Sequence, residues 1–428
     1  MKKFISILLI LTSFIATTSY SLRPEKEITI GEDLIDKENL KAFLMILNII
    51  KAKYVVEVNE KKLIEAALSG MLESLDPYSE YFTEEEYKQI MEHLNAEFGG
   101  IGVEFAFEAS GMKVISPIED TPAYRAGILP GDYIIEINHK PISEMTRFDA
   151  FKKMRGKPGS KVDITVIREE QQNALEFSLT RELIKFNTVK YSSEDDIAYI
   201  RVLSFSKNTA QDFKESYHAI IKENPNVKGL VIDLRSNPGG LVDQAIDIAS
   251  LFVPSGNILI IREREREEAF PTKSNGTVLT EDLPVTVLID KGSASSSEIL
   301  AGALKDYGAA KIMGTKSYGK GTVQLTINRD LPKNYGGFKF TAAYFFTPKG
   351  QKINGVGITP DIIVGQKNLQ KLISETQKLN YGKNHSKNIS SKKIPDILWR
   401  KMLEYDNVLS NAVNSIKGES SSPVRKDK

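Results

Sequence analysis

The chain has 428 residues, of which 41% are hydrophobic and 26% are charged, and its formal net charge is +1. That length exceeds one ordinary domain, and the composition is typical of soluble globular proteins. The near-neutral charge gives no reason to expect nucleic acid as a partner, and the absence of cysteine from this sequence excludes a thiol nucleophile, disulfides and thiolate metal sites.

The first residues have the pattern of an export signal. Met1–Lys3 is basic, Phe4–Ile15 is almost wholly apolar, and Ser19 and Ser21 place small residues where a signal peptidase reads. The apolar run of about 12 residues is shorter than the roughly 20 that span a bilayer as a helix. We therefore predict a signal peptide at residues 1–21 and a periplasmic protein; an uncleaved signal would hold it at the cytoplasmic membrane.

Residues 33–95 are predicted to form a helical domain, because apolar residues recur there at spacings of three and four. One apolar stretch ends at Asp76-Pro77, which stops a helix. Thr83 is followed by three glutamates, which offers a cap and an acidic first turn for another helix. Whether these helices also form a homodimer interface is left open, although their apolar faces favour it.

Residues 96–181 are predicted to form a small β-rich domain. Short alternating apolar runs are separated there by glycine, proline and asparagine turns. The runs are Val103–Phe107, Met112–Ile115, Tyr133–Ile137, Val162–Ile167 and Ala174–Leu179. Two short helices fit between them, near Pro122–Ala126 and at Arg147–Met154.

Residues 182–365 alternate between strands and helices, which predicts a layered α/β core with a largely buried sheet. The predicted strands are Ile197–Leu203, Gly229–Leu234 and Pro284–Asp290, and the helices are Ala210–Lys222, Leu241–Phe252 and Ser295–Tyr307. The tail, residues 366–428, is predicted to be partly helical, with one helix over Ile394–Ile416, and partly disordered.

Ser295 lies where an apolar helix is predicted to begin. Unsatisfied backbone N–H groups and the helix dipole stabilise an anion at such a position. The alternative is that a serine here only caps the helix.

Lys320 follows 25 residues after Ser295, between two glycines that allow close approach of the backbone. A lysine buried against an apolar wall has a lowered pKa, and its neutral amine can take a proton from a serine hydroxyl. If 322–327 is a strand, Gln324 faces the same side as Lys320 and would orient that amine. The alternative is an exposed surface lysine.

The segment Gly314–Lys320 also has the glycine and lysine spacing of a phosphate-binding loop. That loop needs a hydroxyl directly after the lysine, where Gly321 stands, and a helix next, where the sequence alternates like a strand. We therefore reject nucleotide binding.

The turn that follows the buried strand at Asp233 contains Gly239 and Gly240, whose N–H groups could hold an oxyanion. Losing one such donor typically costs roughly 3–4 kcal/mol in the transition state. The alternative is an ordinary strand-to-helix turn, and the sequence does not say which glycine would donate. We interpret Asp233 and Arg235 as a structural ion pair. The four histidines lie far apart in the sequence, which gives no indication of a metal.

Together these segments resemble the carboxyl-terminal processing, or tail-specific, serine proteases of the Ser/Lys class. Their pattern Ser-Ala-Ser-Ala-Ser-Glu falls on Ser293–Glu298, with Ser296 in place of alanine, and Tyr/Phe-Gly-Lys-Gly-Thr-x-Gln falls on Tyr318–Gln324. The resemblance implies a serine endopeptidase that needs no cofactor or metal. The roles that it implies are nucleophile for Ser295, general base for Lys320, orienter for Gln324, and oxyanion donors for Ser296 and either Gly239 or Gly240.

The implied fold is a multidomain α/β protein: a crotonase-like α/β protease core, an inserted β-rich PDZ domain, and helical N- and C-terminal regions. Gly99–Val103 matches the carboxylate-binding loop of PDZ domains. Such a loop captures a terminal carboxylate with backbone N–H groups while the peptide adds a strand to the sheet. The binding residues implied are Gly100, Ile101, Gly102 and Val103.

The partners implied are protein substrates with accessible C-terminal tails, and delivery of substrates by an adaptor protein is left open. Arg155, after the second PDZ helix, is a candidate regulatory residue that could couple tail binding to the dyad; the alternative is an ordinary surface arginine. Another functional hypothesis is a catalytically silent PDZ adaptor. We disfavour an acyl-transfer enzyme for small molecules, because a PDZ domain would then have no purpose.

Overall fold

The computed structural model describes residues 36–367 and 392–418, apart from short gaps at 96, 109–110, 119–120, 130, 146, 169–170, 172, 186, 194–195, 265–269, 277, 280–282, 329–330 and 333–334. The predicted signal peptide and parts of the tail lie outside the described residues. The chain forms two compact units, residues 1–64 and 65–428. No described helix is both long and apolar enough to cross a membrane.

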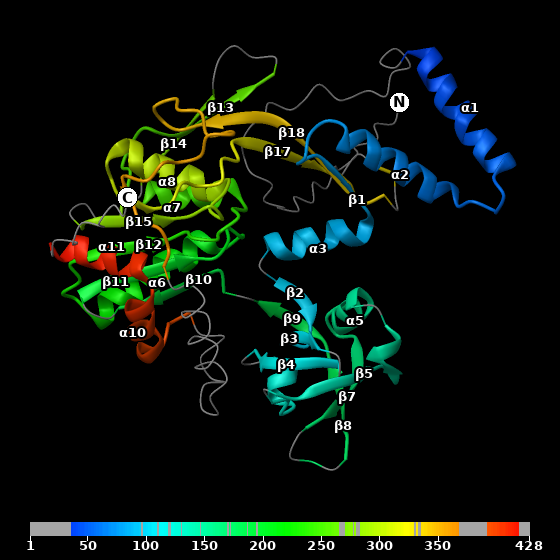
Figure 1. Ribbon diagram of the computed structural model, residues 1–428, viewed down its shortest axis with the longest axis horizontal. Coiled ribbons are helices and arrows are strands. Elements are labelled where there is room, and N and C mark those ends of the chain that lie inside the picture. Colours follow the sequence, from blue (N-terminus) through cyan, green and yellow to red (C-terminus); the bar gives the residue numbers. More distant parts are fainter. Residues whose placement is uncertain are drawn as a thin grey trace, which may run out of the picture. The chain divides into compact units, whose positions relative to one another are not determined.

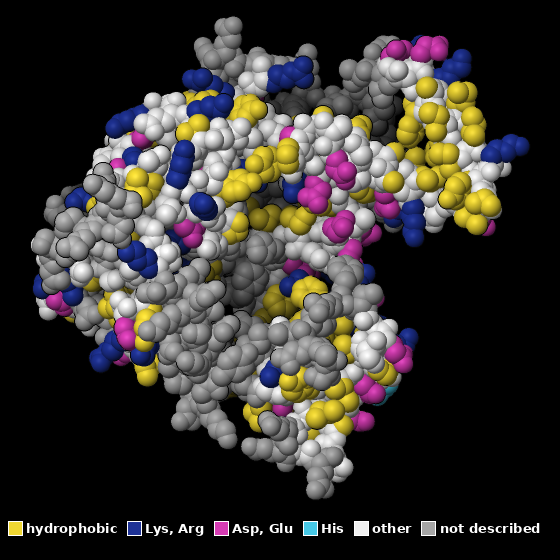
Figure 2. All heavy atoms as spheres, viewed as in Figure 1, with side chains coloured by type: hydrophobic (Ala, Val, Ile, Leu, Met, Phe, Trp, Pro, Cys, Tyr) yellow, Lys and Arg dark blue, Asp and Glu magenta, His cyan; other side chains and the backbone are white. Residues whose placement is uncertain are grey.

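The predicted helical region contains α1 (Lys37–Lys53), α2 (Glu60–Glu73) and α3 (Glu84–Leu94). The predicted cap of α3 is confirmed, since the Glu86 carboxylate accepts from the Thr83 N–H at 2.9 Å and the Thr83 hydroxyl accepts from the Glu86 N–H at 3.3 Å. Helix α1 buries none of its residues, and hydrophobic side chains gather along it (Figure 2).

The β-rich region is a sheet in the order β3-β4-β5-β7-β8, with β6 paired to β5 (Figure 1). Every predicted strand there is confirmed, and α5 has the predicted bounds. The strands are β3 (Val103–Glu108), β4 (Gly111–Pro117), β5 (Tyr133–Ile137), β6 (Lys140–Pro141), β7 (Lys161–Ile167) and β8 (Leu175–Thr180). The helices are α4 (Pro122–Arg125), η1 (Ile142–Glu144) and α5 (Arg147–Met154). A separate two-stranded sheet joins β2 (Glu97–Gly100) to β9 (Glu182–Lys185).

The α/β core has a six-stranded sheet in the order β10-β11-β12-β15-β16-β19, parallel from β11 onward. Its strands are β10 (Val189–Ser192), β11 (Ile197–Val202), β12 (Gly229–Asp233), β15 (Val285–Ile289), β16 (Lys311–Gly314) and β19 (Ile362–Ile363). Its helices are α6 (Thr209–Glu223), α7 (Val242–Ser250) and α8 (Ser296–Tyr307). All residues of β12 and β15 are buried, which explains their continuous hydrophobic runs.

A second sheet of the core has the order β1-β18-β13-β14, and β17 also pairs with β18. Its strands are β1 (Glu80–Phe82), β13 (Asn257–Glu263), β14 (Phe270–Lys273), β17 (Thr322–Ile327) and β18 (Gly337–Phe346). The strand β1 was not predicted, because three residues are too few to show a period. A segment that the sequence assigns to the helical region therefore forms part of a core sheet.

The C-terminal segment forms two helices, α10 (Asp396–Tyr405) and α11 (Asn407–Lys417), so the prediction of one helix over 394–416 is wrong. The break is at Asp406, whose carboxylate accepts from the N–H groups of Val408 and Leu409 and so begins a new helix. Both helices pack on the six-stranded sheet; Trp399 is fully buried, with its ring centre 5.0 Å from that of Tyr199.

Candidate active site

The candidate site lies at the carboxyl ends of β12 and β15, which are neighbouring parallel strands with Asp233 opposite Leu288. Ligand sites in α/β folds occur at this edge of the sheet. The turns that follow the two strands are tied together by Asp290, whose carboxylate accepts from the N–H groups of Ser236 and Gly292, both at 2.8 Å. The two turns are therefore fixed against each other before any substrate arrives.

Ser295 is the N-cap residue of α8, with φ 55° and ψ −115°. A serine that only caps a helix normally has a β-region backbone. A positive φ in a residue other than glycine costs of order 1–3 kcal/mol and persists mainly at functional sites. The conformation therefore favours a nucleophile on a sharp strand-to-helix turn over a simple cap.

Glu298 connects the two predicted dyad residues. Its fully buried carboxylate accepts from the backbone N–H of Ser295 at 2.9 Å and from that of Lys320 at 2.8 Å. It also accepts from the Gly319 N–H at 2.7 Å and from the Ser317 hydroxyl. One side chain thus positions both dyad backbones. Sequence reasoning missed this role, although a glutamate three residues after a capping serine is the signal for it.

Lys320 is half-buried, with its Nζ 4.9 Å from the centre of the Tyr78 ring, so it is not the exposed lysine of the alternative. Burial is the main cause that lowers the pKa of its amine, and the charge of Lys339 adds to it. Asp76 and Glu298 act in the opposite direction. A general base needs a lowered amine pKa of this kind.

Gln324 lies on β17, as predicted, but its contacts are with threonines. Its Nε2 donates to the hydroxyls of Thr322 at 2.9 Å and Thr341 at 3.2 Å. Among the described residues, no hydrogen bond joins the Lys320 amine to Ser295 or to Gln324. Catalytic hydrogen bonds are often formed only when substrate is bound. The structure therefore brings Ser295 and Lys320 together through Glu298 and does not show Gln324 orienting the amine.

The two glycines of the predicted oxyanion turn differ in their hydrogen bonding. Gly239 has φ 102°, and a Cβ there would lie 2.8 Å from that of Ser295, so the position requires glycine. Its N–H donates to the Asn237 side chain at 2.9 Å. No described residue accepts from the N–H of Gly240 or of Ser296. Those two donors are the ones left for an oxyanion.

The predicted ion pair of Asp233 and Arg235 is confirmed and extends further. Arg235 binds Asp233 at 2.6 Å and Asp406, the N-cap of α11, at 2.7 Å. Burial by itself would raise the pKa of Asp233, but the charge and hydrogen bonds of Arg235 outweigh it and hold that pKa well below its ordinary value. Arg235 therefore anchors the oxyanion turn to the C-terminal helices.

The predicted carboxylate loop lies between β2 and β3. Gly102 has φ 77°, and a Cβ there would come within 2.3 Å of Thr121. The N–H groups of Ile101 and Gly102 donate to no other described residue. Beside them β3 is an edge strand of its sheet, and Phe105 on β3 lies 6.3 Å from Phe151 on α5, between ring centres. An edge strand next to vacant donors is what an added peptide strand requires.

The contacts of Arg155 are with the region around α5, and none of them is with Ser295 or Lys320. Its guanidinium stacks over the rings of Phe98 at 4.3 Å and Phe151 at 4.5 Å, and it binds Glu92 of α3 at 3.3 Å. Burial is the main cause that lowers its pKa, against the effect of Glu92. Arg155 therefore links α5 to α3 and β2, and is not an ordinary surface arginine.

No group of three or more His, Cys, Asp or Glu side chains that could hold a metal occurs in the described part of the chain.

Comparison with protein families gives three matches. Residues 196–364 match Peptidase family S41, residues 99–179 match the PDZ domain, and residues 15–86 match the N-terminal domain of the activating protease CtpB.

Two curated relatives cover most of the chain. A carboxy-terminal-processing protease of Bartonella bacilliformis is 41% identical over 343 residues, which is 80% of this chain and 78% of the relative. A probable CtpA-like serine protease of Staphylococcus aureus is 35% identical over 400 residues, which is 92% of this chain and 78% of the relative. Among solved structures, a photosystem II D1 C-terminal processing protease matches with a TM-score of 0.45 and 24% identity, over 82% of this chain and 98% of that one.

Proposed function

The chain belongs to the carboxy-terminal-processing proteases of peptidase family S41, and we propose that it selects proteins by their C-termini and cleaves them with a Ser295/Lys320 dyad. It is a serine peptidase with a PDZ domain in a mixed α/β fold. The observation that carries the proposal is the shared carboxylate of Glu298, which holds the backbones of both residues. The half-buried Lys320 amine supports it.

In the proposed reaction, neutral Lys320 takes the proton of the Ser295 hydroxyl as its oxygen attacks a peptide carbonyl. The N–H groups of Ser296 and Gly240 hold the tetrahedral oxyanion, because the N–H of Gly239 is bonded to Asn237. Lys320 then protonates the leaving amine, and a water activated in the same way releases the acyl-enzyme. Gln324 could bond the amine through its oxygen, since its Nε2 is used by two threonines.

Tail recognition uses the backbone of the loop before β3. The N–H groups of Ile101 and Gly102 receive the terminal carboxylate, next to Gly100 and Val103, and the tail pairs with β3. Arg155 would couple this binding to cleavage through α3, so Arg155→Ala should impair cleavage with tail binding retained. Loss of both together would count against the coupling.

The dyad is tested with wild type, Ser295→Ala and Lys320→Ala on an unfolded substrate with an apolar C-terminus. Each substitution should abolish cleavage and leave tail binding, measured by fluorescence anisotropy, unchanged. Residual turnover in both variants would reject the dyad. A wild type that binds tails without cleaving them would favour the silent adaptor.

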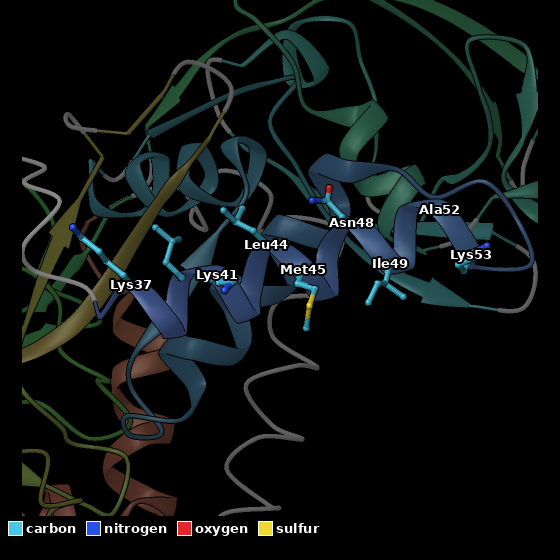
Figure 3. Close-up of a pocket in the computed structure, with 9 residues that line it drawn as sticks. Lys37, Lys41, Leu44, Met45, Asn48, Ile49, Ala52 and Lys53 are labelled. Carbon is cyan, nitrogen blue, oxygen red and sulfur yellow. The ribbon is translucent and has the colours of Figure 1, made fainter.

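The apolar surface of α1 fits a homodimer of this chain. Phe43, Met45, Ile46 and Ile49 are each more than 40% exposed, and Met45 and Ile49 project to the same side of the helix (Figure 3). Exposed apolar faces of this kind mark interaction sites. Ile46→Glu should therefore yield monomers in light scattering, while Asn39→Glu on the same helix should not. A monomeric wild type at micromolar concentration would reject the interface.

The pattern of residues 1–21 supports export to the periplasm. The N-terminal residue of the protein recovered from the periplasm tests this, and a start close to residue 22 is expected. Recovery from the membrane with residues 1–21 intact would show an uncleaved anchor.

A further inference from the structure

The turn Asp76–Ser79 reaches the general base although it lies outside the segment that matches the peptidase family, 196–364. We propose that Tyr78 is a positioning residue for Lys320, with its ring forming the wall that shields the amine from water. The inference rests on the proposed role of Lys320 as base and adds a part of the site that comes from the N-terminal region.

Strand β1 fixes the turn in place. It pairs antiparallel with β18, with Glu80 opposite Lys339 and Phe82 opposite Gly337. The same β18 also pairs with β17, where Gln324 lies opposite Thr341. Because residues 338 and 339 pair with both strands, β18 lies between β1 and β17, and the turn before β1 belongs to the same sheet as the strand that follows Lys320.

The turn is rigid because Asp76 caps it from within. Its carboxylate accepts from the N–H of Tyr78 at 2.7 Å, and from the N–H at 3.0 Å and hydroxyl at 2.9 Å of Ser79. The carboxylate also interacts with the hydroxyl of Thr341, which accepts from Gln324 at 3.2 Å. The turn thus reaches both Lys320 and its predicted orienter.

Tyr78 is held at both ends of its ring. Its backbone is fixed by Asp76, and its hydroxyl interacts with that of Tyr318, two residues before Lys320. The ring centre lies 4.9 Å from the Lys320 Nζ, with the amine over the ring face. A ring in this place covers one side of the amine and keeps water from that side.

The groups that face the Lys320 amine come from three elements: Asp76 and Tyr78 from the turn, Glu298 from α8 and Lys339 from β18. A ring face also attracts an ammonium ion. Burial is nevertheless the largest influence on this amine, so losing the ring should raise its pKa on balance. Losing the negative charge of Asp76 should lower it.

Asp76 is charged in the working pH range. Burial, the largest influence on it, acts to raise its pKa, but hydrogen bonds from Tyr78 and Ser79 outweigh burial and hold the pKa below its ordinary value. Substituting Tyr78 and substituting Asp76 are therefore predicted to shift the pKa of Lys320 in opposite directions.

The test is the pH dependence of kcat/KM for wild type, Tyr78→Ala, Tyr78→Phe and Asp76→Asn. Because only the neutral amine acts as base, activity rises with pH through the pKa of Lys320. Tyr78→Ala should move this rise to higher pH and lower kcat/KM about tenfold at neutral pH, since one pKa unit changes the neutral fraction tenfold. Activity should recover in alkaline buffer. Tyr78→Phe keeps the ring and should follow wild type, and Asp76→Asn should move the rise to lower pH.

Phe82→Leu is the matched control, because it removes another ring of the same segment, the one under the Lys339 amine at 5.0 Å. It should lower the melting temperature without moving the pH profile. A Tyr78→Ala profile that is parallel to wild type and merely reduced would overturn the inference.

If Tyr78→Ala does not fold, Tyr78→Gln, which keeps a long side chain but no ring, takes its place, and an unshifted profile overturns the inference. The proposed function fails separately, if Ser295→Ala and Lys320→Ala still cleave. If Ser295→Ala and Lys320→Ala do not cleave and the turn variants keep the wild-type pH profile, only the proposed role of the turn is rejected.

Discussion

The turns of the proposed catalytic site and the proposed carboxylate loop are held in different ways. Around the proposed dyad, the side chains of Asp290, Asn237 and Glu298 accept from backbone N–H groups of the turns, and those of Asn237 and Glu298 are buried. The loop at Ile101 and Gly102 instead leaves its N–H groups without a described acceptor. Both places keep two N–H groups vacant for a ligand, but a catalytic site must fix the surrounding turns with side-chain acceptors in advance of the transition state.

The largest effect is expected from substituting Glu298, which holds the turns of the proposed catalytic site. Glu298→Gln keeps the shape but can no longer accept all four hydrogen bonds, so at least one buried donor is left unpaired at about 1–3 kcal/mol. We expect kcat to fall about a hundredfold, with KM for the tail unchanged. Asp306→Asn, also buried in α8, is the control and should stay within about twofold. Equal losses in the two variants would contradict a specific role.

Gly102→Ala changes the loop that is proposed to bind the tail carboxylate. The new Cβ would meet Thr121 at 2.3 Å, in a positive-φ conformation that alanine disfavours. If the strain reduces the binding free energy by about 2 kcal/mol, the tail should bind about thirtyfold more weakly. Cleavage of a short peptide that does not need the PDZ domain should be unchanged. Gly127→Ala, with a φ of 79° but open space around it, controls for backbone strain, and its tail binding should match wild type.

A smaller effect is expected at the distant anchor of the oxyanion turn. Asp406→Asn can keep the cap of α11 but loses one acceptor for Arg235. We expect kcat to fall about tenfold and the free energy of unfolding to fall by about 2 kcal/mol, as for a hydrogen bond to a charged group. Steady-state kinetics and urea denaturation measure both, with exposed Asp396→Asn as control. Lost stability with unchanged kcat would restrict Asp406 to folding.

The smallest effect is expected at Lys339, whose charge helps to lower the pKa of Lys320. Lys339→Met should raise that pKa slightly, because a partly exposed charge is screened. We expect kcat/KM at neutral pH to fall about twofold to threefold and to recover at higher pH. Exposed Lys316→Met should have no effect, and a loss that does not recover would contradict an electrostatic role.

Sequence by itself determined many of the elements of this protein and all of the motifs discussed. The cap at Thr83, the buried strands β12 and β15 and the start of α8 near Ser295 were all predicted, because caps and periodicity depend on residues close together in the chain. Prediction from the sequence failed where the deciding partner is far away in the chain. Strand β1 is too short to show a period and is defined by its pairing with β18. The break between the two C-terminal helices is at Asp406, which contacts the distant Arg235.

Only the tertiary structure decided the chemistry available to the motifs. Whether the Lys320 amine is buried depends on Tyr78, and which glycine keeps a free N–H depends on where the Asn237 side chain lies. Burial and hydrogen-bond partners are properties of packing between distant segments, so local spacing can name a base and a donor but cannot give their environment.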